Sequence, residues 1–389
     1  MFEYFPTNYG WTLSVACCLS MGGELTEVHE ACKPLVPFAE APLAVGNEAW
    51  YQSWMSVSER VEAQGDAMLA KGWEFSAGAR YFRAAQYGFV AERHASWKAP
   101  RKMLAYRRAS ALFAKAVKLL GHRTERIEVP FAKGSLAGYL RLPEGKGPFP
   151  TIVMLNGFDG IKEMQYGFAG DEAVKRGIAV IFIDQDGTGE SARFHAMPKP
   201  VESEKAVSAF IDRLEKHPDV DRDRIGVIGC SNGGYDAPRA AIHEPRLKLA
   251  VSFGAFYNGD CLRPMFEDLI AHPERPRRGL DFGDQVQAVM AREGLQEAFD
   301  AWCERTLEGQ LAGLKVPYLI LHGENDRLVP LHFAERCLRE AVNSPRAELK
   351  VFSIAEGSTE HCGIDLMASH SQYMFDWVAE IFGGRVKAA

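Results

Sequence analysis

The sequence predicts an α/β fold, with a mostly parallel, doubly wound sheet preceded by a domain made only of helices. Three observations predict it. From residue 123 onward, short apolar runs alternate with amphipathic segments, a pattern typical of parallel sheets with helices on both faces. Residues 1–122 carry apolar stripes at helical spacing and no strand pattern. Residues 229–234 form a glycine-rich turn between an apolar run and a helical one, with a serine at its apex.

The length and charge of the chain narrow the classes of function. At 389 residues the chain exceeds one ordinary core, so we expect two domains, 1–122 and 123–389. Hydrophobic residues make up 47% and charged residues 25%, which is typical of a globular protein in water. The net charge is −6 and there is no basic block, so we expect no nucleic acid and no membrane as partner.

Eight cysteines are scattered along the chain without a C-x-x-C pair, so the sequence predicts no metal site. Cysteines in apolar surroundings are mostly buried free thiols, which fits a reducing cytoplasm. The apolar stretch 11–21 lacks a preceding basic region and does not resemble a signal peptide. No apolar run has the length of a membrane span. We therefore expect a cytoplasmic protein.

The first domain is expected to contain several amphipathic helices. Residues 24–35 are one, and Trp50 and Trp54 begin an apolar stripe that continues to residue 61. Ser76 is the expected N-cap of the next helix, and Gly121 the expected C-terminal stop of another that contains residues 106–120. We expect the aromatic side chains of these stripes to form a core rather than a ligand pocket.

The second domain begins with an expected hairpin and continues with buried strands. Residues 126–130 and 134–142 alternate around a short turn, which is typical of two antiparallel strands. Continuous apolar runs, typical of strands buried on both faces, follow at 151–155, 178–183, 225–228, 247–253, 316–322 and 347–354. Helices are expected at 168–176, 201–216, 235–242, 333–341 and 370–382. Residues 254–314 are less regular and rich in charge and proline, so we expect an insertion over the sheet.

The turn at Ser231 has the G-x-S-x-G pattern of a nucleophile elbow. Such a turn holds its serine in a strained backbone conformation, so the residues two before and two after it, Gly229 and Gly233, must nearly lack side chains. The N-terminus of the helix that follows directs amide N–H groups to where negative charge develops during acyl transfer. The alternative is a glycine-rich turn that contains a serine by chance.

A serine hydroxyl needs a base, and the base needs an acid that orients it. The expected acid is Asp326, just past the strand at 316–322, with Glu324 as the fallback. The alternative is a turn aspartate that caps the following helix. The expected base is His361, on a loop after the last strand, with His195 and His322 as its nearest competitors.

The oxyanion formed during acyl transfer needs two backbone donors. One is expected to be the N–H of Asn232, directly after the serine. The other is expected to be the N–H of Phe158, in the loop after the first buried strand. The alternative for this loop is a simple Asn-Gly turn.

Taken together, these motifs resemble α/β-hydrolases with an N-terminal helical cap. That group includes 2,6-dihydroxypseudooxynicotine hydrolase, the fungal polyketide-shortening (heptaketide) hydrolases and the FrsA-like esterases. The resemblance extends over nearly the whole chain and is carried by residues 5–11, 76–85, 156–160, 229–235, Asp326 with 329–330, and 360–362. It implies an α/β-hydrolase fold with residues 1–122 as a cap that closes the pocket.

The resemblance implies a serine hydrolase that cleaves a carbon–carbon bond next to a ketone in a polyketide-like or aromatic 1,3-dicarbonyl or acyl-phenol substrate. A carboxylesterase or thioesterase is the alternative, and a catalytically idle binding protein is a third possibility. Asp159, Tyr257 and Asp260 are candidates for substrate binding, with a capping or surface role equally open for Asp260. Pro238 departs from the group and is expected to bend the helix after the elbow. We expect a small-molecule substrate, no cofactor, and a homodimer.

Overall fold

The computed structural model describes residues 1–387, which form two compact units. One unit is Met1–Thr124 with His272–Gln285, and the other is Glu125–Ala271 with the chain from Val286 onward. Residues 272–285 therefore belong with the helical unit, although the sequence assigns them to an insertion over the sheet.

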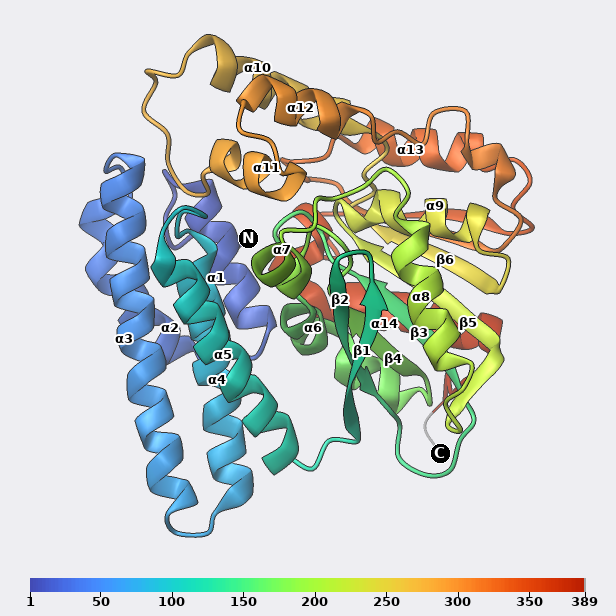
Figure 1. The fold of residues 1–389 in the computed structure, drawn as a ribbon, viewed down its shortest axis with the longest axis horizontal. Helices are drawn as coiled ribbons and strands as arrows, with labels where there is room; N and C mark the ends of the chain where they lie inside the picture. The colour runs from blue at the N-terminus through green and yellow to red at the C-terminus, as the bar shows by residue number, and fades with distance from the viewer. Residues whose placement is uncertain (388–389) are drawn as a thin grey trace. The chain divides into compact units, whose positions relative to one another are not determined.

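Helices alone build the first unit up to residue 122, as predicted. They are α1 (Tyr9–Ser20), α2 (Leu25–Cys32), the 3₁₀ helix η1 (Lys33–Phe38), α3 (Leu43–Leu69), α4 (Glu74–Arg93) and α5 (Pro100–Leu119). The long helices α3, α4 and α5 pack side by side (Figure 1). Trp50 is fully buried, with its ring 5.0 Å from that of Trp11 and 5.4 Å from that of Trp54. The aromatic stripe thus forms a core, as predicted.

The predicted N-cap at Ser76 is wrong, because α4 begins two positions earlier, at Glu74. Gly72 adopts φ +75°, which turns the chain sharply after α3 and lets the next helix start at once. Glu74 then places a carboxylate in the first turn, where the helix dipole favours it. Gly121 follows α5 with φ +70°, the left-handed conformation predicted for its C-terminal stop.

An eight-stranded sheet forms the centre of the second unit. Its strands are β1 (Thr124–Phe131), β2 (Gly134–Arg141), β3 (Phe149–Leu155), β4 (Ala179–Ile183), β5 (Val220–Cys230), β6 (Leu247–Phe253), β7 (Tyr318–Gly323) and β8 (Ala347–Phe352). Their order is β1-β2-β4-β3-β5-β6-β7-β8. The strands from β3 to β8 pair in parallel, and β2 pairs antiparallel with β4. The predicted mostly parallel, doubly wound sheet is confirmed.

After β3 the chain forms β4 on one side of it, and then crosses back to form β5 on the other side. Right-handed crossovers therefore place α6 (Lys162–Lys175) on one face of the sheet and α8 (Glu204–Leu214), α9 (Gly233–His243) and α13 (Leu331–Glu340) on the opposite face (Figure 1). The last helix, α14 (Met367–Phe382), packs against α6. The neighbours β3 and β5 consequently send their following loops to opposite faces, and open α/β sheets bind ligands at the carboxyl ends of such a strand pair.

The helices of this unit differ from the predictions mainly at their starts. Helix α6 begins at Lys162 rather than at 168, and a short helix, α7 (Gly189–His195), was not predicted. The segment after β6 contains η2 (Gly259–Leu262), α10 (Arg263–Ala271), α11 (Phe282–Met290), α12 (Leu295–Cys303) and η3 (Leu311–Gly313). A 3₁₀ helix, η4 (His361–Leu366), precedes α14.

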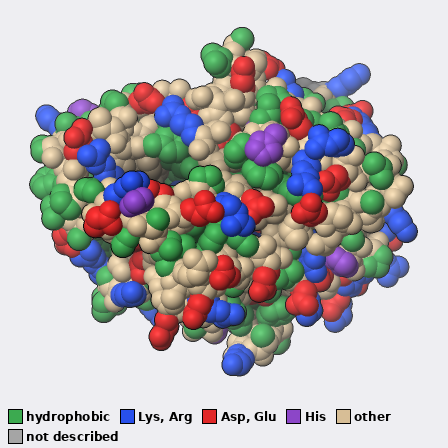
Figure 2. Space-filling model, turned by 90° about the horizontal axis from the view of Figure 1, so that it is seen from above, with side chains coloured by type: hydrophobic (Ala, Val, Ile, Leu, Met, Phe, Trp, Pro, Cys, Tyr) green, Lys and Arg blue, Asp and Glu red, His purple; other side chains and the backbone are tan. Residues whose placement is uncertain are grey.

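The surface seen in Figure 2 carries acidic and basic side chains interspersed with apolar ones, as a solvated face does. All eight cysteines are free, and all but the half-buried Cys303 are buried, as predicted. Within residues 1–387, no helix combines the length and apolar character needed to cross a membrane. In the same residues, no cluster of His, Cys, Asp or Glu side chains is arranged to hold a metal ion.

Candidate active site

Ser231 occupies the tight turn between β5 and α9. Its φ is +53°, in the left-handed region that a serine rarely adopts. A Cβ on Gly229 would lie 1.8 Å from the carbonyl oxygen of Gly233, and one on Gly233 would lie 2.7 Å from that of Asn156. Both glycines are therefore required by close backbone approach, as the elbow pattern predicts.

His361 lies between Ser231 and Asp326. Its Nε2 is 2.8 Å from Oγ of Ser231, and its Nδ1 is 2.8 Å from Oδ2 of Asp326. The other carboxylate oxygen of Asp326 accepts backbone N–H groups of Leu328 and Val329, each at 2.9 Å. These bonds fix the carboxylate, so the structure brings together the three residues that the sequence selected.

The side chains of His361 and Asp326 are largely removed from water: His361 is 8% exposed, and the Asp326 side chain 1%. Burial alone would lower the pKa of His361, but the charge and hydrogen bond of Asp326 outweigh it and raise that pKa above its ordinary value. For Asp326, burial opposes ionisation, yet His361 and the Val329 amide hold its pKa below the usual range. Asp326 is thus ionised at neutral pH and stabilises an imidazolium.

The competing residues have other partners. Glu324 accepts the backbone N–H of Ile354 at 2.9 Å. His322 is buried, with Nε2 2.9 Å from the Val329 carbonyl, and burial lowers its pKa. His195 ends α7 and lies against the start of β2, where a Cβ on Gly134 would be 2.7 Å from its Nδ1.

The two predicted oxyanion donors flank Ser231. Asn232 follows it directly and is the N-cap of α9. The loop after β3 lies against the serine, because a Cβ on Gly157 would be 3.1 Å from the Ser231 Cβ and 3.6 Å from its Oγ. Phe158 is the next residue of that loop. Asn232 and Gly157, the residue before Phe158, are therefore both next to Ser231, which agrees with the expected place of two oxyanion donors.

The three substrate-binding candidates have different surroundings. The charge of Asp159 is one of the smaller causes that raise the pKa of His361, after Asp326 and Cys230. The Tyr257 hydroxyl donates to the Glu340 carboxylate on α13 at 2.8 Å. Asp260 pairs with Arg263, and its side chain is 48% exposed. Thus the polar groups of Tyr257 and Asp260 are paired with residues other than the three central ones.

Pro238 lies inside α9 without interrupting it. A proline cannot donate to the carbonyl four residues earlier, here that of Gly234. The hydroxyl of Ser252 on β6 donates to this carbonyl instead, at 2.8 Å. A side chain from the sheet thus replaces the missing helical hydrogen bond.

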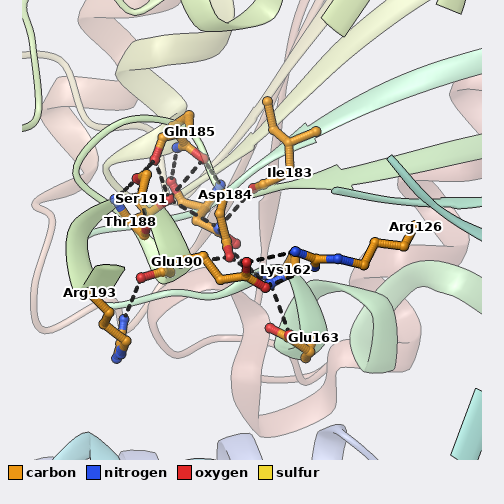
Figure 3. Close-up of polar contacts among 12 residues, drawn as sticks. Arg126, Lys162, Glu163, Ile183, Asp184, Gln185, Thr188, Glu190, Ser191 and Arg193 are labelled. Atoms are coloured by element: carbon orange, nitrogen blue, oxygen red, sulfur yellow. Dashed lines mark hydrogen bonds and ion pairs between the residues drawn. The ribbon is translucent and has the colours of Figure 1, made fainter. Parts of the chain in front are cut away.

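A buried charge cluster behind the loop after β3 was not found from the sequence. The ammonium of Lys162 lies 2.8 Å from Asp184, 2.6 Å from Glu190 and 2.9 Å from Glu163 (Figure 3). The carboxylate of Asp184 also accepts the side-chain N–H of Asn156 at 2.9 Å. Asp184 follows an apolar strand directly, and this position at a strand end is the signal that could have singled it out.

Comparisons with known proteins agree on one family. The sequence model of a family described as Esterase FrsA-like matches residues 44–323. The chain is 30% identical over 340 residues to 2,6-dihydropseudooxynicotine hydrolase of Paenarthrobacter nicotinovorans, covering 87% of this chain and 86% of that one. It is 30% identical over 235 residues to the alpha/beta hydrolase ucsC of an Acremonium species, covering 54% of this chain and 47% of that one.

Among solved structures, that of 2,6-dihydroxy-pseudo-oxynicotine hydrolase superposes with a TM-score of 0.75 at 27% identity, covering 94% of this chain and 95% of that one. The similarity thus includes nearly the whole fold of that hydrolase.

Proposed function

Because the chain belongs to the FrsA-like esterase family and is an α/β-hydrolase, we propose that it hydrolyses a carbon–carbon bond next to a ketone. Its substrate would be a small polyketide-like or aromatic 1,3-dicarbonyl or acyl-phenol compound. The observation that carries the proposal is the position of His361, within hydrogen-bond distance of both Ser231 and Asp326. Ser231 is the proposed nucleophile, His361 the base and acid, and Asp326 the residue that orients it.

The proposed reaction begins when His361 Nε2 takes the hydroxyl proton of Ser231 and Oγ attacks the ketone carbon. The resulting oxyanion accepts the amides of Phe158 and Asn232. Its collapse breaks the carbon–carbon bond, and the leaving carbon, stabilised as an enolate or phenolate, receives the proton from His361. Water, deprotonated by His361, then releases the acid from Ser231.

One feature supports proton delivery to carbon. The carboxylates of Asp326 and Asp159 both favour the imidazolium form of His361. A carbon leaving group must be protonated as the bond breaks, and the imidazolium formed when His361 takes the Ser231 proton is the acid that supplies this proton.

The alternative is a carboxylesterase or thioesterase with the same three residues. The description of the matched family as an esterase favours it. An ester leaves as an alkoxide or phenoxide, and the same histidine would protonate that oxygen.

The test compares p-nitrophenyl esters with acyl-phenol ketones and aromatic 1,3-diketones, with products identified by mass spectrometry. Ketone cleavage with wild-type Ser231 and none with Ser231→Ala is the expected result. Ester turnover without ketone cleavage would establish the alternative. Full activity of Ser231→Ala would exclude both.

We also propose that the protein acts in the cytoplasm, because its eight free thiols persist in a reducing compartment. A homodimer is proposed too, and light scattering on the purified protein tests it. The division into a cap domain of residues 1–122 and a catalytic domain of residues 123–389 stays a prediction from the sequence.

A further inference from the structure

A short segment at the end of α12, residues 302–305, contacts both residues that carry the predicted oxyanion donors. Trp302 is fully buried, and its ring meets that of Phe158 edge-on at 4.9 Å. It meets the ring of Phe256 in the same way at 5.3 Å. Edge-to-face pairs at these separations are favourable beyond the area they bury. Trp302 therefore supports the side chain of the residue whose amide is one of the two donors.

Three residues later, Arg305 contacts the residue that carries the other donor. Its side chain is fully buried, and Nη1 donates to Oδ1 of Asn232 at 2.6 Å. Nη2 donates to Asp236, one turn further along α9, and Nε donates to the Pro200 carbonyl at 3.1 Å. A buried guanidinium is tolerated only when its donors are paired in this way. Arg305 therefore fixes the first turn of the helix that begins at the elbow.

The same polar network continues to the loop that carries Phe158. Gln185 donates from Nε2 to Asp236 at 3.4 Å and to the carbonyl of Asn156 at 2.9 Å. Its Oε1 accepts the N–H of Asn156 at 3.1 Å. Both backbone groups of Asn156 are thus paired with one side chain. The loop after β3 and the start of α9 are joined through Gln185, Asp236 and Arg305.

We propose that Arg305, supported by Trp302, is a positioning residue that holds the amides of Asn232 and Phe158 at the geometry required by the oxyanion. The inference rests on the proposed function. Donors to an oxyanion act strongly only when they are held in place before charge develops, and small displacements weaken them. Trp302 contacts the side chain of Phe158 and Arg305 contacts that of Asn232, so this segment links the residues that carry the two amides.

The first test is the kinetics of Arg305→Met and Arg305→Lys. The turnover number is expected to fall about 10- to 100-fold while KM changes less than about threefold, because the lost interaction belongs to the transition state. Affinity for a trifluoromethyl ketone, which forms an oxyanion on the serine, is expected to fall in parallel. A turnover number within twofold of wild type in both variants would overturn the proposal.

The matched control is Arg239→Met. Arg239 lies on the same helix and is nearly buried, but it pairs with Glu204 and Gln310 instead of Asn232. Its loss is expected to lower the melting temperature and leave the turnover number unchanged. An equal loss of turnover in this control would show that any damage to α9 suffices, and would overturn the specific role of Arg305.

A double-mutant cycle with Asn232→Ala tests the contact itself. This substitution removes the acceptor of Arg305 and keeps the backbone amide. If Arg305 acts through Asn232, the two losses of turnover will overlap strongly, whereas additive losses would overturn the proposal. If Arg305→Met does not fold, Asn232→Ala tests the proposal by itself. It is expected to lower the turnover number, and an unchanged turnover number would refute the positioning role of Arg305.

These outcomes are separable from failure of the proposed function. An active Ser231→Ala variant would remove the function and the inference together. An inactive Ser231→Ala variant alongside fully active Arg305 variants would remove the inference alone.

Discussion

Replacing Lys162 with Met is expected to destabilise the second unit strongly. The side chains of Lys162, Asp184 and Glu163 are all 0% exposed, and the ammonium lies within 2.9 Å of both carboxylates. Without it, two buried acids lose their counter-charge, although Asp184 keeps the N–H groups of residue 162 and Glu190. Removing one partner of a buried pair costs about 3–5 kcal/mol. For a unit of this size, such a loss lowers the melting temperature by about 6–10 °C.

The assay is thermal unfolding followed by circular dichroism at pH 7. The control is Arg126→Met, because Arg126 bonds Glu190 from the edge of the same cluster while its side chain is 37% exposed. Exposed pairs are worth under about 1 kcal/mol, so this variant is expected to melt within a few degrees of wild type. A Lys162→Met variant that melts no lower than Arg126→Met would refute the reasoning.

Three further predictions concern the triad and the charge cluster. Asp326→Asn is expected to lower the turnover number about 10⁴-fold, since the amide no longer selects the productive tautomer of His361; steady-state kinetics showing a loss under tenfold would contradict it. Because the pKa of His361 is raised, the acid limb of the pH profile of kcat/KM is expected above pH 6.5. Asp159→Asn is expected to move this limb to lower pH, because it removes one of the charges that raise the pKa. A limb that does not move would show that Asp159 has no influence on the pKa of His361. Burial raises the pKa of Glu163 from 4.5 to about 6, so the folded state binds the extra proton and wild-type stability falls as pH rises through this window. The stability of Glu163→Gln is expected not to fall in this window, so its free energy of unfolding, measured by urea titration at pH 8, is expected to exceed that of wild type by about 2 kcal/mol. If the stabilities of the two proteins change with pH in parallel, ionisation of Glu163 does not destabilise the fold.

The sheet and the three central residues could be predicted because they follow from local patterns. Buried parallel strands appear as continuous apolar runs, and their carboxyl ends share one edge of the sheet. Ser231, Asp326 and His361 each follow such a run, so their convergence needed no knowledge of long-range packing. In the structure Asp326 lies against His361, whereas Glu324 accepts the backbone N–H of Ile354.

The remaining residues depend on contacts that no local pattern encodes. Asp260 stands near the end of a strand but is captured by Arg263, three positions later in sequence. Tyr257 is held by Glu340, far along the chain. Arg305 lies in a segment whose sequence is irregular, and its importance appears only when the chain returns it to Asn232. Such roles are set by the path of an insertion, which hydrophobic periodicity does not specify.

The loops at the site also explain why two buried polar networks occur so close together. A loop that leaves the end of a buried strand carries backbone N–H and C=O groups that cannot pair within the sheet, and unpaired groups there are costly. Asn156 begins such a loop, and its partners come from both networks. Its side chain donates to Asp184 of the Lys162 cluster, while its backbone pairs with Gln185, which continues to Asp236 and Arg305. Apolar packing could bury this loop, but it would not fix the direction in which the backbone N–H groups point. Hydrogen bonds depend on direction, so they bury the loop and also orient its N–H groups. An oxyanion donor acts only when its N–H group points at the oxyanion.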